Sequence, residues 1–157
     1  MVYLYEKKIK GKSYFYLRSS ERKAGKIIVK DISYLGKSIK KIINKAKSDK
    51  EIIAVLLFGS SLTKQGRDID ICLVLKEKQS NYNMTEKRFE YLKIGDYDIQ
   101  VFQQLPLYIR NRILKEHLIL LCKDEKTLYE LAFATIKEFE FYKKMYYLCL
   151  NKIKSGK

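Results

Sequence analysis

The sequence has few of the residues that build metal sites or disulfide frameworks. Its three cysteines, Cys72, Cys122 and Cys149, are odd in number, far apart and set among apolar neighbours, and His117 is the single histidine. No two cysteines have the Cys-x-x-Cys spacing, so the pattern argues against a zinc site. We expect buried, reduced thiols, as in a cytoplasmic protein.

Long apolar runs are also missing. No stretch reaches the roughly 18 apolar residues that a membrane span needs, so we expect no membrane contact. The first residues also lack the charged and apolar segments of a signal peptide. Proline occurs once, as Pro106, and no low-complexity linker interrupts the 157 residues, of which 46% are apolar. We expect one folded domain, or one domain with a small appendage.

Acidic residues are scarce in the first third of the chain. Residues 1–50 contain 15 Lys/Arg and 4 Asp/Glu, whereas residues 51–157 contain 18 and 14. Such an excess of positive charge favours an anionic partner, for which RNA is the candidate. A lysine-rich surface that is simply solvated is the alternative. The sequence leaves open whether the protein forms a homo-oligomer.

Residues 1–35 predict a small β unit. Residues 2–9 and 13–20 are rich in tyrosine and aliphatic residues, Lys10-Gly11 suits a two-residue turn, and residues 26–34 offer a third strand. With this turn one face of the hairpin is aromatic and basic and the other mainly aliphatic, and a slip by one residue would mix them. The expected pairs are Lys7–Tyr14, Tyr5–Tyr16 and Tyr3–Arg18 on the first face, and Glu6–Phe15, Leu4–Leu17 and Val2–Ser19 on the second.

Residues 36–157 predict a larger domain. A helix is expected at 37–49, a strand buried on both faces at 52–58, and a long final helix with apolar residues on two sides at 125–152. Between them we expect a short helix or loop at 60–66, a strand at 68–75, a mobile polar connection at 77–85, strands at 88–94 and 97–102 joined by a turn at Gly95-Asp96, a helix at 105–116 and a strand at 118–122. This order predicts an α+β fold, with a mixed, antiparallel-rich sheet flanked by helices.

Three acidic residues are candidates for a metal site. Asp68 and Asp70 are two apart on a predicted strand, which puts their side chains on one face with Cα atoms about 6.5 Å apart. Carboxylates this close repel unless a cation joins them, and Mg²⁺ prefers such ligands. Asp98 is predicted in the middle of a later strand, where a lone carboxylate is costly without a ligand. Together, Asp68, Asp70 and Asp98 are predicted to bind two Mg²⁺ ions.

A candidate phosphate site precedes these acids. Gly59 allows close approach of the backbone, and Ser60 and Ser61 with exposed N–H groups can hold a triphosphate. Lys64 and Arg67 would add positive charge. The alternative is that Ser60 or Ser61 caps a helix and that the Asp-x-Asp pattern has arisen by chance.

The order Leu57-Phe-Gly-Ser60, then Asp68-Ile-Asp70, resembles the minimal form of the DNA polymerase β nucleotidyltransferase superfamily. The resemblance covers about residues 38–145, including the strand with Asp98 and the segment 105–114. It implies that Gly59 and Ser60 hold phosphates, that Asp68 and Asp70 bind Mg²⁺, and that Asp98 binds metal and helps to activate an acceptor hydroxyl. It also implies transfer of a nucleoside monophosphate from ATP or another nucleoside triphosphate.

Minimal members of this superfamily often act as antitoxins that are paired with HEPN-domain ribonuclease toxins, and some adenylylate a tyrosine of the toxin. The resemblance therefore implies a HEPN-domain partner, which the final helix could dock. Three features depart from the family pattern. Only seven residues separate Ser60 from Asp68, fewer than is typical, Arg67 replaces a small residue, and the loop glycine comes late, at Gly66.

These observations predict a cytoplasmic, Mg²⁺-dependent nucleotidyltransferase that moves AMP to a hydroxyl, such as a tyrosine of a HEPN-type toxin. One alternative is a catalytically degenerate antitoxin or RNA-associated regulator, which the short loop and the basic N-terminal segment favour. A further alternative is a nucleotidyltransferase that modifies a small molecule.

Overall fold

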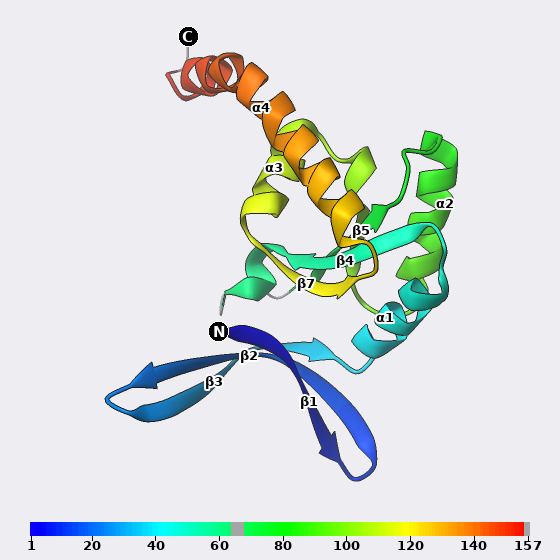
Figure 1. Cartoon of the computed structure of the whole chain (residues 1–157), viewed down its shortest axis with the longest axis vertical. Coiled ribbons are helices and arrows are strands. Elements are labelled where there is room, and N and C mark those ends of the chain that lie inside the picture. Colours follow the sequence, from blue (N-terminus) through cyan, green and yellow to red (C-terminus); the bar gives the residue numbers. More distant parts are fainter. Residues whose placement is uncertain (64–67, 156–157) are drawn as a thin grey trace.

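The N-terminal residues form a three-stranded antiparallel sheet. In the computed structural model, which describes residues 1–63 and 68–155, β1 (Val2–Ile9), β2 (Lys12–Lys23) and β3 (Lys26–Gly36) are neighbours in that order. Both turns, Lys10-Gly11 and Ala24-Gly25, have two residues with positive φ, as tight hairpins require. The two hairpins diverge as twisted arms at the bottom of Figure 1.

The register predicted for the first hairpin is confirmed. All six expected pairs are present, with Tyr5 opposite Tyr16 on one face and Leu4 opposite Leu17 on the other. β3 runs two residues further than predicted, to Gly36. Its pairing with β2 shifts at two irregularities, one between Phe15 and Tyr16 and one between Leu17 and Arg18.

Four strands form a second sheet, in the order β6-β5-β4-β7. They are β4 (Ile52–Phe58), β5 (Asp70–Leu75), β6 (Asp98–Val101) and β7 (His117–Cys122). β4 is antiparallel to β5 and to β7, whereas β5 and β6 are parallel. Every residue of β4 is buried, which confirms the prediction of a strand covered on both faces. The mixed, antiparallel-rich sheet is confirmed as well.

Helices cover both faces of this second sheet (Figure 1). They are α1 (Ile39–Ser48), α2 (Asn81–Leu92), α3 (Leu107–Lys115) and α4 (Glu125–Lys154), with short 3₁₀ turns at Gly59–Leu62 and Phe102–Gln104. One core joins the sheet to α1, α2 and the N-terminal sheet, through residues that include Leu57, Ile42, Tyr91 and Leu17. The other core joins the opposite face to α3 and α4, through Leu56, Ile113 and Leu128.

The prediction of a mobile connection followed by a strand at 88–94 is wrong. Residues Asn81–Leu92 form helix α2, and the side chain of the preceding residue, Ser80, caps it by accepting a hydrogen bond from the Asn83 N–H. Met84 and Tyr91 lie seven residues apart and are both fully buried, because two helical turns bring them to one face. The Gly95-Asp96 segment therefore follows a helix and does not join two strands.

Two expectations from the composition can be compared with the structure. Within the described part of the chain, no helix is both long and apolar enough to cross a membrane. All three cysteines lie in that part as free thiols, but Cys72 alone among them is buried. The expectation of burial is wrong for Cys149, because the far end of α4 exposes it.

Candidate functional site

The end of β4 bends sharply at Gly59. Its φ is +77°, a left-handed conformation that side chains other than glycine adopt only with strain. A Cβ atom at this position would also collide with the carboxylate of Asp70. Because Phe58 pairs with Asp70 across the sheet, the bend carries the backbone of Gly59 directly against that carboxylate. Glycine is thus required here for two reasons: the backbone has a positive φ, and the Asp70 carboxylate leaves no room for a Cβ atom.

Two of the predicted acids stand side by side. Asp70 begins β5 and Asp98 begins β6, and the parallel register pairs these two residues directly. Neighbouring strands are about 4.8 Å apart, so the two side chains meet at the edge of the sheet next to Gly59. Asp68 is exposed and precedes β5 by two residues, so the prediction that Asp68 and Asp70 lie on the same strand is wrong.

The predicted setting of Asp98 needs correction. Asp98 was predicted in the middle of a strand, but it is the first residue of β6 and 47% of its side chain is exposed. The cost of burying a lone carboxylate is therefore no argument for a metal ligand here. The side chain accepts a hydrogen bond from Gln100 Nε2 at 2.8 Å, and Arg88 Nη2 lies 3.5 Å away. These two partners orient the Asp98 carboxylate.

The charges of the three acids act on one another at Asp70. Burial raises the pKa of Asp70, and the negative charges of Asp98 and Asp68 raise it further, while the positive charge of Arg112 lowers it. Burial and the negative charges of these two acids therefore disfavour ionisation of Asp70. Such repulsion is relieved when a cation is shared between the groups.

These acids fit a divalent cation by their chemistry. Mg²⁺ takes carboxylate oxygens and keeps other positions open for phosphates, and Asp68, Asp70 and Asp98 offer oxygen ligands at one sheet edge. In residues 1–63 and 68–155, however, no three His, Cys, Asp or Glu side chains are already gathered as metal ligands. Asp68 and Asp98 are exposed, so packing does not lock their rotamers away from a shared ion.

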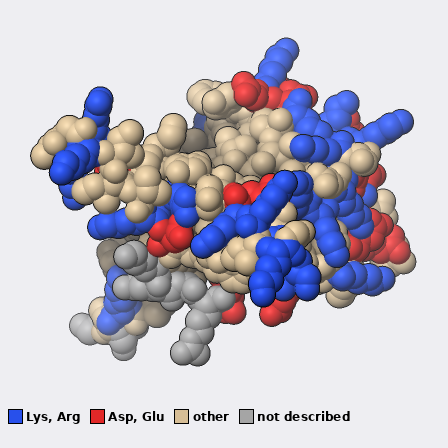
Figure 2. All heavy atoms as spheres, turned by 90° about the horizontal axis from the view of Figure 1, so that it is seen from below, with Lys and Arg blue, Asp and Glu red and all other residues tan. Residues whose placement is uncertain are grey.

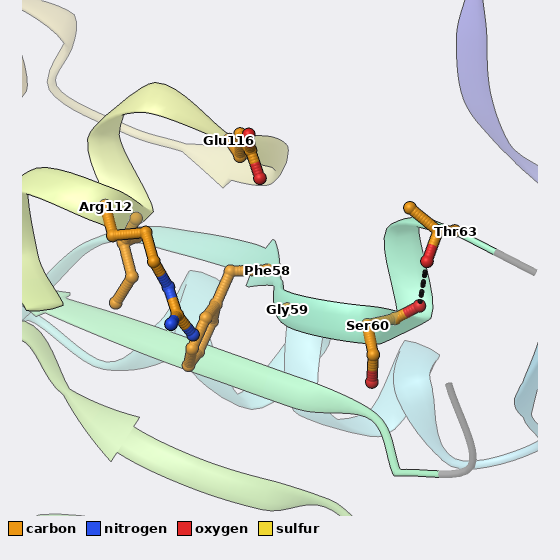
Figure 3. Close-up of a pocket in the computed structure, with 7 residues that line it drawn as sticks. Phe58, Gly59, Ser60, Thr63, Arg112 and Glu116 are labelled. Carbon is orange, nitrogen blue, oxygen red and sulfur yellow. Dashed lines mark hydrogen bonds between the residues drawn. The ribbon is translucent and has the colours of Figure 1, made fainter. Parts of the chain in front are cut away.

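A hollow with a volume of about 310 Å³ opens on one side of the Gly59 bend. Gly59, Ser60 and Thr63 line it from the bend, and Arg112 lines it from α3, with Glu116 at the end of that helix. Figure 3 shows the guanidinium of Arg112 reaching from α3 toward Phe58 and the bend. Thr63 Oγ1 donates to the Ser60 carbonyl at 3.0 Å, which holds the turn closed.

Sequence reasoning missed Arg112. The helix 105–116 was predicted, but its approach to Gly59 depends on how α3 packs on the second core. The available signal was an arginine within the segment 105–114 that resembles the family.

Of the other predicted residues, Ser61 is buried and its hydroxyl donates to the Phe58 carbonyl at 3.1 Å. Lys64 and Arg67 lie outside the described residues.

A second hollow is lined by two of the acids. Asp68, Asp96, Tyr97 and Asp98 line it together with Ile69 and Leu92. It shares Ile69, Asp96 and Tyr97 with a further hollow lined by Tyr34, Gly36, Lys37 and Ser38. We call these two adjoining hollows the trough, and their linings together reach from Asp98 to the base of the N-terminal sheet.

Comparisons with known proteins agree with this geometry. A family model described as polymerase beta nucleotidyltransferase matches residues 40–126. A Methanocaldococcus jannaschii protein, provisionally named a protein adenylyltransferase, is 36% identical over 75 residues, which is 45% of this chain and 56% of that protein. The chain therefore spans just over half the length of this relative.

Solved structures show the same fold. The chain matches a structure of a toxin–antitoxin with AMP-PNP at 18% identity and a TM-score of 0.58, over 74% of this chain and 98% of that one. It also matches a structure of a tri-AMPylated Shewanella oneidensis HEPN toxin with its MNT antitoxin, at 14% identity and a TM-score of 0.55, over 74% and 92% of the two chains. Since the family match covers more than half of the residues, the chain belongs to the polymerase β nucleotidyltransferase family.

Proposed function

We propose that the protein transfers AMP from ATP to a hydroxyl group of a partner protein, and that it acts as the antitoxin of a HEPN-type toxin. The observation that carries the proposal is the meeting of Gly59, Asp70 and Asp98 at one sheet edge. Gly59 lines the hollow beside the bend, which we call the phosphate hollow, and Asp98 lines the trough.

The phosphate hollow suits the triphosphate of ATP. Exposed N–H groups at a tight bend bind anions, and Ser60 adds a hydroxyl. Arg112 adds a guanidinium, which pairs with phosphate oxygens in a forked geometry. We assign Gly59, Ser60 and Arg112 to triphosphate binding, and Lys64 and Arg67, which follow Ser60 in the chain, remain candidates.

The three acids would carry the chemistry. Asp68, Asp70 and Asp98 would hold Mg²⁺, which when bound neutralises charge on the triphosphate. The acceptor oxygen forms a bond to the α-phosphorus, the bond from the α-phosphorus to the bridging oxygen breaks, and pyrophosphate leaves. Asp98, oriented by Arg88 and Gln100, accepts the proton of the hydroxyl.

The extent of the trough suits a macromolecular acceptor. Its lining extends from Asp98 to Tyr34, beyond the residues next to the acids. A tyrosine on a protein segment could lie along it. The relative named as a protein adenylyltransferase and the AMPylated toxin in a structural neighbour support the same class of acceptor.

The far part of α4 is the surface that we assign to this partner. Phe141, Met145 and Leu148 recur at helical spacing and are 84%, 63% and 63% exposed. Phe133 and Ile136 are also exposed, on another side of the helix. In Figure 1 the end of α4 extends beyond the sheets and the other helices. Exposed apolar surface of this kind is typical of protein interfaces.

The test is a transfer reaction with ATP labelled in its α-phosphate, Mg²⁺ and the protein encoded by the neighbouring gene. We expect label on that protein, and a loss of about a hundredfold or more with Asp70→Asn, since the acids position the reacting charges. Arg112→Gln should weaken ATP binding. Asp31→Asn, which changes an acid in the N-terminal sheet, is the matched control and should leave transfer unchanged.

The second candidate is a degenerate antitoxin that binds its partner without transferring AMP. The short loop between Ser60 and Asp68 favours it. Calorimetric titration with ATP and Mg²⁺ separates the two. The enzyme should bind ATP and lose binding in Asp68→Ala, whereas absence of ATP binding in the unaltered protein would favour the degenerate form.

A further inference from the structure

The N-terminal sheet has one face that points away from the first core, and one residue of this face, Tyr34, also lines the hollow beside Asp96 and Tyr97. Its opposite face contributes Phe15, Leu17 and Leu35 to the first core. The other face carries alternate residues of β1 and β2 and their partners on β3. These are Tyr3, Tyr5, Lys7, Tyr14, Tyr16, Arg18, Asp31 and Tyr34, and we call them the tyrosine face. The family match begins at residue 40, so the nucleotidyltransferase fold does not account for it.

The tyrosines form a connected cluster. The rings of Tyr16 and Tyr34 are 5.2 Å apart and those of Tyr14 and Tyr34 are 6.5 Å apart, in tilted arrangements. Tyr34 is 46% exposed, and Tyr14 and Tyr16 are partly exposed. Tilted rings that reach solvent leave aromatic surface onto which a planar group can stack.

Positive charges lie directly against these rings. The guanidinium of Arg18 lies 3.4 Å from the centre of the Tyr5 ring, and Lys37 Nζ lies 5.0 Å from that of Tyr14. Lys7 is exposed opposite Tyr14. Asp31 on β3 pairs with Arg18 at 2.6 Å. Figure 2, which views the molecule from below, shows many Lys and Arg side chains on this side, with Asp and Glu side chains among them.

We infer that the tyrosine face binds single-stranded nucleic acid. Proteins that bind single strands combine aromatic side chains, on which bases stack, with positive charges that follow the backbone. An acidic protein segment would pair with the positive charges of the lysines, but it has no planar bases to stack on the tyrosine rings. A duplex would satisfy the charges alone, because its bases are already stacked. RNA and DNA single strands share the chemistry that this face recognises.

The experiment measures fluorescence anisotropy of labelled oligouridylate and oligothymidylate of about 15 nucleotides, near the upper site size of single-strand binding modules. The full chain is used. The test variant is Tyr14→Ala/Tyr34→Ala, and the conservative variant is Tyr14→Phe/Tyr34→Phe, which keeps the rings. Tyr82→Ala, at a tyrosine of α2 that is 70% exposed, is the matched control. Circular dichroism checks the fold of each variant.

We expect the alanine double variant to bind about tenfold or more weakly, the usual effect of removing stacked rings. The phenylalanine variant and Tyr82→Ala should bind as the unaltered protein does. Lys7→Glu/Lys37→Glu should weaken binding and reduce its dependence on salt, because fewer counterions are released. Comparison of the two oligonucleotides tells whether RNA or DNA is preferred.

Two results would overturn the inference. The first is equal binding by the alanine and unaltered proteins, which would reduce the interaction to general attraction by a net charge of +15. The second is displacement of the oligonucleotide by an acidic peptide as readily as by unlabelled strand, which would point to a protein partner. Neither readout depends on AMP transfer, so a protein without that activity can still pass this test.

Discussion

At the scale of single residues, Gly59 links the conformation of the chain to the position of an acid. We predict that Gly59→Ala destabilises the protein by about 2–4 kcal/mol, because it adds strain at positive φ to the displacement of Asp70. Urea unfolding measures the change. In an Asp70→Ala background the collision with the carboxylate is removed, so the penalty should fall to about 1–2 kcal/mol of backbone strain. An equal penalty in both backgrounds would show that Asp70 does not press on the bend.

At the scale of elements, Asp49 ties the end of α1 to α2. Its carboxylate, with 11% of the side chain exposed, accepts from Lys87 Nζ at 3.0 Å and from the Tyr91 hydroxyl at 3.2 Å. Burial raises the pKa of Asp49, but hydrogen bonds from Lys87, the Glu51 N–H and Tyr91 together hold it below its ordinary value. The lowered pKa means that the folded protein is stabilised by the ionised carboxylate.

We predict that Asp49→Ala costs about 2–3 kcal/mol of stability, as expected for hydrogen bonds to a charged group. Because the folded pKa is lowered, this contribution should be complete above about pH 4, the ordinary pKa of aspartate. It should then decline as the pH falls toward the folded value. Glu90→Ala, which removes an exposed ion pair with Lys45 between the same helices, should change stability by less than about 0.5 kcal/mol. Similar losses in both variants would contradict this account.

At the scale of the whole molecule, the two sheets share a core. Leu17 and Leu35 of the N-terminal sheet are fully buried with Ile42 and Leu57, and the Tyr97 hydroxyl donates to the Leu35 carbonyl at 2.9 Å. We therefore predict that residues 1–35 and 36–157, although separate in sequence character, unfold in one transition. Leu17→Ala should lower the stability of the whole chain by about 2–5 kcal/mol. Ile27→Ala, at an exposed position of the same sheet, should have little effect. Calorimetry with two separate transitions would contradict the shared core.

The parts that the sequence predicted are those set by local chemistry. The hairpin register followed from the Lys10-Gly11 turn and the alternation of its strands, and β4 followed from an unbroken apolar run. Helix α2 was missed because its two core residues, Met84 and Tyr91, are a weak signal within a polar segment. The pairing of Asp70 with Asp98 needs a parallel register, and the approach of Arg112 to Gly59 needs helix packing. Both depend on tertiary contacts that no local pattern encodes.

The length of α4 has a consequence for how a partner would be modified. A helix of 30 residues is about 45 Å long, and its exposed apolar end lies far from the sheet edge with the acids. A partner that binds to this end of α4 is tethered to the enzyme, while its flexible segments can still move and bring a target hydroxyl to the acids. Tethering can raise the local concentration of a target hydroxyl to the order of millimolar. An acceptor trough that binds its target weakly would then suffice, because the contact with α4 would supply most of the affinity.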